Sequence, residues 1–446
     1  MQLSVVQETV QRRSQQIVDL LRRLIKVESY NPPGNEDRVA EVVAEELEEH
    51  GIPYKLLYSD EHRANIVARI KFGGSRARLL FCGHMDTVPP GDLDKWRYHP
   101  LSAELEGGRV YGRGSADMKS GLAAIVTVAA LLADSEVLSA NLEGELLLAV
   151  VADEEMGSEY GMKFLVEKIP QELRADYAII AEPSGSRKIG KTIVIGEKGD
   201  YAVNITFHGR QAHSSTPFLG DNAVEKACKF AANLHKLKLR SVKSPITKLE
   251  YAKQLAGRMG WLAMIKSSLK RGEGTSSMLK ALTEPVISAT MIHGGFKSNV
   301  IPERCTVTVD FRVLPGHTER DVVEAVRELA SKLGLGEPSL EFEVKVEPSL
   351  LKGGEILVER LTSLVERIYG EAPLKVLMPG ASDARFLRNQ LGVPTVQFGP
   401  GDAEAAHAID EYVEVDDLLK ATQVYLALAK SLLTGEQSAN SKSPLK

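Results

Sequence analysis

The stretch LLLAVVADEEMGS, residues 146–158, runs from an apolar segment into three consecutive acids, Asp153, Glu154 and Glu155. A strand that is apolar on both faces is typical of a mostly parallel sheet covered by helices on both sides. Like charges placed side by side repel one another unless positive charge, such as a bound metal ion, compensates for them. The stretch therefore predicts a buried strand, and the role of the three acids at its end depends on what the other strand ends supply.

Strands and helices alternate around this segment. Other apolar runs of strand character lie at residues 64–70, 77–82 and 175–182, and helices are expected at residues 15–27, 36–50 and 120–134. This alternation predicts an α/β fold with a mostly parallel sheet flanked by helices.

A chain of 446 residues is too long for one ordinary core, so we expect two domains. Near residue 198 the pattern changes to alternating strands and a helix, which indicates a small α+β unit with antiparallel strands. Beyond residue 317 helices and strands alternate as before. The expected organisation is a discontinuous α/β domain of residues 1–197 and 317–446, with residues 198–316 inserted into it.

A basic stretch stands apart within the insertion. Residues 236–284 contain eleven Lys or Arg and three Glu, and the excursion itself spans about residues 243–283. Two interpretations stay open. It is either a solvated helical excursion or a basic lid or docking surface for an anionic substrate, partner or membrane face.

The composition narrows the class of protein. The net charge of −5 gives no electrostatic reason to expect nucleic acid as a partner. Cys82, Cys228 and Cys305 lie far apart without a CxxC pair, so they look like buried thiols in a reducing compartment. Residues 1–27 contain neither a signal-peptide core nor a membrane span. The expected partners are small molecules or short peptides, and the expected location is the cytoplasm.

Residues of the metal-ligand type follow the predicted strands. These are His84 and Asp86, Glu154 and Glu155, and Glu182, together with Asp117 before the apolar helix and His407 near the C-terminus. In α/β sheets, ligands collect beyond the carboxyl ends of the strands. Two His and several carboxylates at one edge suit a divalent metal ion, with zinc first and cobalt or manganese as alternatives.

Each motif taken singly allows another interpretation. An acidic strand end can be a capped strand or a solvated turn, and YGRGSADMKSG, residues 111–121, has the look of a dinucleotide-binding loop. However, the sixth position of GRGSAD is Asp117 instead of Gly, and the stretch precedes a long buried strand instead of following one. The joint occurrence of the motifs at strand ends favours the metal site.

Nine short segments of the sequence are informative when they are taken together and in order. In chain order they are GHMDTVPPGD, YGRGSADMKSG, ADEEMGS, AEPS, QAHSS, GGFKSNVIPE, DFRVLPG, PGASDARF and AHAIDEYV. They resemble, in the same order, segments of the zinc-dependent aminoacylase/carboxypeptidase family that includes acetylornithine deacetylase and succinyl-diaminopimelate desuccinylase. The resemblance covers about residues 15–430 and implies a zinc exopeptidase-like catalytic domain, an inserted dimerisation or lid domain, and a homodimer.

The resemblance also implies two zinc ions. His84 and Glu182 would bind one ion, Glu155 and His407 would bind the other, and Asp117 would bridge the two.

Two further residues receive catalytic roles from the same resemblance. Asp86 would orient the imidazole of His84 by accepting its second N–H. Glu154 would remain unligated and act as the general base on the metal-activated water. Asp153 is expected to point elsewhere as a structural hydrogen-bond acceptor.

The resemblance also implies that residues of the insertion and of the C-terminal part bind the substrate. His213 would cross a dimer interface and stabilise the oxyanion. Asn299, Gly380 and Ser382 would contact the substrate, and the planar guanidinium of Arg312 suits an α-carboxylate. Arg312 is equally well explained as an ordinary ion-pair partner.

The activity implied is hydrolysis of the amide bond of an N-acyl amino acid. A metallo-carboxypeptidase or dipeptidase of the same family is the alternative, because the motifs do not fix the loops that shape the pocket. A non-catalytic binding protein with this fold would be expected to lack a ligand or the base, whereas this chain has all of them.

Overall fold

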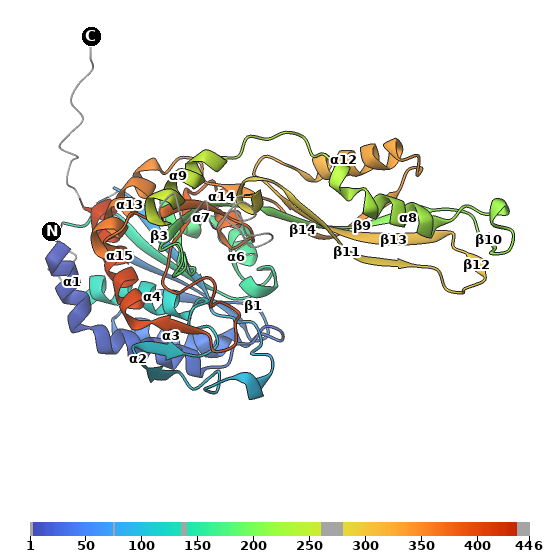
Figure 1. The fold of residues 1–446 in the computed structure, drawn as a ribbon. Coiled ribbons are helices and arrows are strands. Elements are labelled where there is room, and N and C mark those ends of the chain that lie inside the picture. The colour runs from blue at the N-terminus through green and yellow to red at the C-terminus, as the bar shows by residue number, and fades with distance from the viewer. Residues whose placement is uncertain (1–2, 75, 135–140, 260–279, 435–446) are drawn as a thin grey trace, which may run out of the picture. The chain divides into compact units, whose positions relative to one another are not determined.

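The computed structural model describes residues 3–74, 76–134, 141–259 and 280–434 (Figure 1). The chain forms two compact units. Unit 1 comprises Met1–Ile195, Leu351–Lys375 and Ser382–Lys446, and unit 2 comprises Gly196–Leu350 and Val376–Ala381. Unit 2 thus interrupts unit 1 along the sequence, as an inserted domain does.

The insertion ends later than the sequence suggests. Helix α12 (Glu319–Lys332) and strand β14 (Ser339–Val346), which we expected in the α/β domain, belong to unit 2. The reason is that β14 pairs antiparallel with β9 (Gly199–His208) and so completes the sheet of the insertion. A helix followed by a strand has the same local pattern in both kinds of domain. Unit 2 therefore runs to Leu350 and not to residue 316.

The sheet of unit 1 is parallel at its centre. In the order β1-β2-β6-β3-β7-β17-β8, neighbours from β6 to β17 run parallel, and the outer pairs are antiparallel. The strands are β1 (Tyr54–Asp60), β2 (Arg63–Lys71), β3 (Arg78–His84), β6 (Glu145–Val151), β7 (Tyr177–Ile180), β17 (Thr395–Gln397) and β8 (Thr192–Glu197), whose last residues enter unit 2. The expected α/β fold class is confirmed.

Strand β6 buries both of its faces, which explains its apolar sequence. Leu146, Leu148 and Val150 belong to one hydrophobic core, and the alternate residues Leu147, Ala149 and Val151 belong to another. Full burial of one Leu or Val side chain contributes about 1.5–3 kcal/mol.

Helices cover both faces of this sheet. The helices of the first core are α1 (Leu3–Arg12), α2 (Ser14–Lys26), α3 (Glu36–Glu49), α4 (Lys119–Asp134), α13 (Glu355–Tyr369) and α15 (Val415–Leu433). Those of the second core are α6 (Met162–Lys168), α7 (Pro170–Leu173) and α14 (Ala384–Asn389). Figure 1 shows the blue N-terminal helices beside the red α15 on one side of the sheet.

Helix α4 approaches the sheet closely. All of its residues from Lys119 to Leu132 are buried. A Cβ atom at Gly121 would lie 2.0 Å from the carbonyl oxygen of Ala181, so this contact requires glycine. The contact brings the start of α4, which follows Asp117, next to the segment that leads into Glu182.

Unit 2 is built on an antiparallel sheet in the order β11-β13-β9-β14, with α8 and α12 in its hydrophobic core. Its remaining elements are β11 (Val286–Gly294), β13 (Arg304–Val313), β10 (Ala212–His213), β12 (Val300–Ile301), β15 (Ser349–Leu350), α8 (Ala223–Ala232) and α9 (Lys248–Met259). Helix α9 covers part of the basic excursion. Our prediction for residues 260–279 of that excursion lies outside the described residues.

A few short elements complete the chain. They are β4 (Glu104–Glu106), β5 (Arg109–Tyr111) and β18 (Tyr412–Glu414), which form a small sheet of unit 1, β16 (Leu374–Met378), and the 3-10 helices η1 (Leu93–Lys95), η2 (Glu154–Met156), η3 (Pro217–Leu219) and η4 (Leu234–Lys236). Within the described residues, none of the helices has the length and apolarity needed to cross a membrane. Cys82 and Cys305 are buried free thiols, but Cys228 is exposed on α8, unlike the expected buried thiol.

Candidate metal centre

Three parallel strands bring their carboxyl ends together in unit 1. β3 ends at His84, β6 leads into η2 with Glu154 and Glu155, and β7 is followed by Glu182. The Nε2 atom of His84 lies 3.5 Å from a carboxylate oxygen of Glu182 and 3.9 Å from one of Glu154. These donor atoms lie close enough together to surround one metal ion.

Asp117 lies between the two histidines of the site. Its Oδ1 atom is 3.2 Å from Nε2 of His84, and its Oδ2 atom is 3.3 Å from Nε2 of His407. The same nitrogen of His407 is 3.1 Å from Oε1 of Glu155. The structure therefore brings together all five predicted metal ligands, with one carboxylate facing both imidazoles.

The donor set fits a divalent cation. Imidazole nitrogens and carboxylate oxygens are the ligands that zinc and related ions take. Glu182 is 5% exposed, and its buried Oε1 atom accepts no hydrogen bond among the described residues, although the imidazole of His84 lies 3.5 Å away. A buried charged oxygen without a hydrogen bond is costly, and a coordinated metal ion would reduce that cost.

The ionisation of these groups shows how strongly they interact. Burial raises the pKa of Glu154 and of Glu182 well above the usual value. Burial lowers the pKa of His84, but Glu182, Asp117 and Asp86 raise it by more, so it lies well above the usual value. All three shifts favour the protonated form of the group when no metal ion is bound.

His407 shows the same effect at the more exposed side of the cluster. Hydrogen bonds to Asp117 and Glu155 raise the pKa of His407 to about 10. Its imidazole is therefore protonated near neutral pH when no metal is bound. A metal ion would have to displace this proton.

The three consecutive acids have different surroundings. Asp153 has a positive φ of 66° and accepts hydrogen bonds from Asn31 at 2.9 Å, Arg63 at 2.5 Å and the main-chain N–H of Tyr160 at 3.1 Å. It is a structural acceptor, as we expected. Glu154 and Glu155 continue into η2 and face the histidines.

Asp86 mainly supports the turn that carries these two glutamates. Its two carboxylate oxygens accept the main-chain N–H groups of Glu154 and Glu155, each at 3.1 Å, and Asn31 donates to it at 2.9 Å. The nearest acceptor for Nδ1 of His84 is the main-chain carbonyl of Asp86 at 2.9 Å, whereas the carboxylate lies 3.4 Å away. The main-chain carbonyl of Asp86 thus orients His84, and its carboxylate fixes the acidic turn, residues 153–155.

Sequence reasoning missed a buried network behind the acidic turn. Arg63 forms ion pairs with Asp153 at 2.5 Å and with Glu36 at 3.0 Å, and its side chain is 7% exposed. Asn31 joins this network to Asp86. The polar residues of NPPGNE, residues 31–36, were the available signal, but in the sequence they are typical of a loop that ends a helix.

The predicted substrate-binding residues are divided between the units. Ser382 is in unit 1, and His213, Asn299, Arg312 and Gly380 are in unit 2.

Two of these residues have structural partners. Arg312 forms ion pairs at 3.0 Å with Asp200 and with Asp310, which favours the interpretation as an ion-pair partner. The hydroxyl of Ser382 accepts the main-chain N–H of Ala384 at 3.1 Å, at the start of α14.

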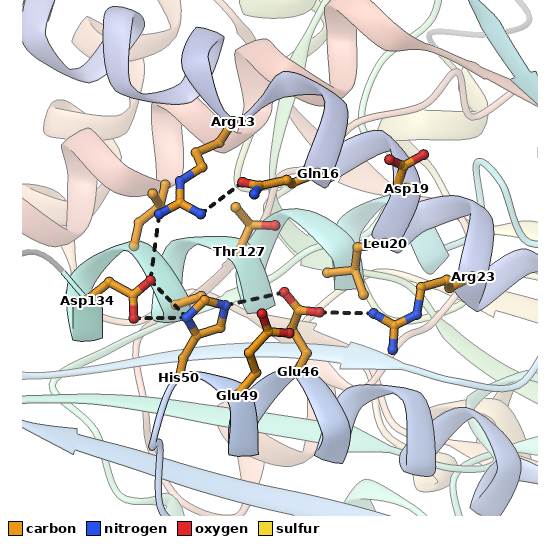
Figure 2. A pocket seen from close by; sticks show the side chains of 12 residues that line it. Arg13, Gln16, Asp19, Leu20, Arg23, Glu46, Glu49, His50, Thr127 and Asp134 are labelled. Atoms are coloured by element: carbon orange, nitrogen blue, oxygen red, sulfur yellow. Dashed lines mark hydrogen bonds and ion pairs between the residues drawn. The ribbon is translucent and has the colours of Figure 1, made fainter.

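A separate cavity of about 200 Å³ lies between α2, α3 and α4 (Figure 2). His50 lies at its wall, with Nδ1 2.8 Å from Asp134 and Nε2 3.5 Å from Glu46. Arg23 contacts Glu46 at 3.2 Å, and Arg13 contacts Asp134 at 3.7 Å. These ion pairs join the three helices, so the cavity is a charged junction within the scaffold.

Comparisons with known proteins agree with the geometry. The model of the family described as "Peptidase family M20/M25/M40" matches residues 80–431. A protein of Staphylococcus aureus (strain MSSA476), described as "Probable succinyl-diaminopimelate desuccinylase", is 30% identical over 413 residues, which are 92% of this chain and 95% of that protein.

Solved structures share the fold. An M20 family metallo-carboxypeptidase from Sulfolobus solfataricus, Sso-CP2, has a TM-score of 0.71 at 23% identity and covers 94% of this chain and 98% of its own. The di-peptidase Dug1p from Saccharomyces cerevisiae has a TM-score of 0.70 at 16% identity, with coverages of 98% and 99%. The match of the family model over most of the chain confirms the resemblance found in the sequence. The chain therefore belongs to peptidase family M20/M25/M40 and is a metal-dependent hydrolase.

Proposed function

We propose that this chain is a dinuclear zinc hydrolase that cleaves the amide bond of an N-acyl amino acid. The observation that carries the proposal is the position of Asp117, whose two carboxylate oxygens lie 3.2 and 3.3 Å from the imidazoles of His84 and His407. A carboxylate that faces two separate nitrogen donors suits a ligand shared by two metal ions. His84 and Glu182 would hold one ion, and Glu155 and His407 the other.

Zinc suits this donor set, with cobalt or manganese as alternatives. Bound as a pair, such ions would supply a Lewis acid for the scissile carbonyl and lower the pKa of a coordinated water to about 7.

Glu154 is the proposed general base. It lies 3.9 Å from Nε2 of His84, so its carboxylate is beside the metal ligands but farther from the imidazole than Asp117 or Glu182. Burial raises its pKa, which favours a carboxylate that takes up a proton and returns it to the departing amine. Asp86 would fix the turn that carries Glu154 through its bond to the main-chain N–H.

His213 is the proposed oxyanion donor, supplied by the second subunit of a homodimer. It lies exposed on β10 of unit 2, and its Nδ1 atom accepts the main-chain N–H of Ser215 at 3.1 Å. An imidazole whose Nδ1 accepts this N–H carries a proton on Nε2, and that N–H could donate to a developing oxyanion. Asn299 and Gly380 would contact the rest of the substrate.

The choice of acyl amino acid as substrate rests on the S. aureus relative described as a desuccinylase. The alternative is a carboxypeptidase or dipeptidase, as the names of the solved neighbours suggest. The free thiols of Cys82, Cys228 and Cys305 suit cytoplasmic residence.

A substrate panel should separate these activities. The zinc-loaded protein is offered N-succinyl and N-acetyl amino acids and unblocked dipeptides, and release of the free amine is measured. We expect the highest kcat/KM for an N-acyl amino acid. Faster cleavage of dipeptides or of C-terminal residues would replace the proposal with the peptidase alternative, and turnover of none of them would refute both.

Replacing Glu154 should separate catalysis from metal binding. Glu154→Gln should keep two metal ions per chain but lower kcat by about 10²–10⁴, because the amide cannot accept the proton of the attacking water. The matched control is Glu159→Gln, since Glu159 is exposed on the following loop and pairs only with Lys163 among the described residues. A Glu154→Gln variant with wild-type kcat would remove Glu154 from the base role.

Metal affinity should rise with pH. His407 has a pKa of about 10 in the metal-free protein, and the pKa of His84 is also well above its usual value, so bound protons must be displaced. The logarithm of the association constant should therefore rise by at least about one per pH unit between pH 7 and 9. The sign follows because fewer protons compete as pH increases. The proton on His407 stabilises the metal-free fold up to the unfolded pKa of 6.5, and that stabilisation is lost as pH rises towards 10.

Chelator competition at several pH values measures this slope. His407→Gln should bind the metal more weakly and show a slope lower by about one, because it has no displaceable proton at this position. An affinity that is constant between pH 7 and 9 in the wild-type protein would contradict the proposed role of His407 as a ligand.

Subunit mixing tests the position of His213. His213→Ala and Glu154→Gln should each be inactive alone, but a mixture should recover about one quarter of wild-type activity at full exchange, because half of the dimers are mixed and each has one intact site. If both groups act within one chain, no activity returns. Sedimentation of the mixture checks that dimers form, and an active wild-type monomer would exclude a role in trans.

A further inference from the structure

Glu411 is a buried carboxylate whose contacts converge on one short loop. It is 1% exposed. Its Oε1 atom accepts the main-chain N–H groups of Ala116 at 2.8 Å and Asp117 at 3.0 Å. Its Oε2 atom accepts from Arg113 Nη1 at 2.6 Å and from the main-chain N–H of Gly114 at 3.1 Å. All four donors therefore come from residues 113–117, the loop that ends in the proposed bridging ligand.

Arg113 connects this loop to the segment that carries His407. Its guanidinium donates to the main-chain carbonyls of Ala408 at 3.2 Å and His407 at 3.4 Å, in addition to Glu411. The guanidinium also lies over the ring of Trp96, 5.1 Å from its centroid, and the side chain of Arg113 is 3% exposed. A planar guanidinium with several donors can hold three acceptors at fixed angles, which a lysine could not.

The two segments are also joined through their main chains. The N–H of Gly112 donates to the carbonyl of Glu411 at 2.9 Å. Residues 112–117 and 407–411 are therefore bound to each other by main-chain, carboxylate and guanidinium contacts at once. The side chains at the far ends of these two segments, Asp117 and His407, face each other at 3.3 Å.

We propose that Glu411, paired with Arg113, is a positioning residue for the metal centre. It fixes the loop of Asp117 against the segment of His407, so that the bridging carboxylate and the imidazole are held at a set separation before any metal binds. Hydrogen bonds behind a ligand set its orientation and commonly change metal affinity or activity by about 10- to 100-fold. The inference rests on the metal centre of the proposed function, but not on its substrate.

A carboxylate is required at position 411 because only a charged acceptor suits four N–H donors in a buried place. In Glu411→Gln the amide nitrogen would face N–H donors of the loop and would leave Arg113 without a counter-charge. The loop would then lose its fixed position, although the side chain keeps its size. We expect the second of two metal ions to bind at least about tenfold more weakly, while the first is less affected.

The experiment uses the full-length protein and cobalt or zinc ions alone. Metal stoichiometry and affinity are measured by chelator competition, and the visible spectrum of the cobalt form reports ligand geometry. For Glu411→Gln we expect weaker binding of one ion, a changed cobalt spectrum, a kcat about 10- to 100-fold lower, and an almost unchanged KM. Arg113→Lys keeps the charge but loses the planar fork, so it should show a smaller change in the same direction.

Glu414→Gln is the matched control. Glu414 lies three residues further along the chain, but it is partly exposed and pairs with Arg109 and Arg187 at the surface. The Glu414→Gln variant should bind metal with the same affinity as the wild-type protein. The proposal is overturned if Glu411→Gln, or Arg113→Lys when the first variant does not fold, loses only thermal stability and keeps wild-type metal affinity and cobalt spectrum.

Failure of the positioning role of Glu411 can be distinguished from failure of the proposed function. If no acyl amino acid is hydrolysed but Glu411→Gln still weakens metal binding, the positioning role stands and the substrate assignment fails. If the wild type hydrolyses its substrate and Glu411→Gln binds both ions as tightly, the positioning role alone fails.

Discussion

The concentration of buried negative charge at the ends of parallel strands is the constraint on which the rest of unit 1 depends. Three parallel strands end at one edge, and each delivers acidic or imidazole side chains there. A buried carboxylate is tolerated only if it is neutralised, protonated or supplied with hydrogen-bond donors. Burial raises the pKa of Glu154 and Glu182 well above the usual value, so in the protein alone these two groups favour the protonated form. The fold therefore leaves a place at this edge that a cation fits.

The buried acids fall into two groups according to their partners. Asp86, Asp153 and Glu411 receive main-chain N–H groups or a guanidinium from several sides, so their charges are already used in holding loops together. Asp117, Glu155 and Glu182 have few partners other than the two histidines. The acids with many donors form the support, and those with few form the site. The number of hydrogen-bond donors thus distinguishes acidic residues that lie close together in the sequence, such as Asp153 and Glu155.

Much of the fold and of the site could be predicted from the sequence, because the two-sided burial of β6 and the positions of acids after strands are local patterns. The boundary at residue 316 could not, because a helix followed by a strand does not show which sheet the strand joins, and β14 joins β9. Glu411 was missed although its segment was recognised. Its role arises from contacts with residues 113–117, almost three hundred positions away, and no local pattern distinguishes it from a surface acid such as Glu414.

The division of the chain explains why its chemistry is easier to infer than its substrate. All proposed metal ligands and the base lie in unit 1, on strand ends and loops whose positions are fixed by many hydrogen bonds. The expected substrate contacts His213, Asn299 and Arg312 lie in unit 2. The guanidinium of Arg312 is already paired with Asp200 and Asp310, so a substrate carboxylate would have to compete with two neighbouring acids for it. Under the proposed function, specificity would depend on residues of unit 2, whereas the metal centre would depend on residues of unit 1 that hydrogen bonds hold in place.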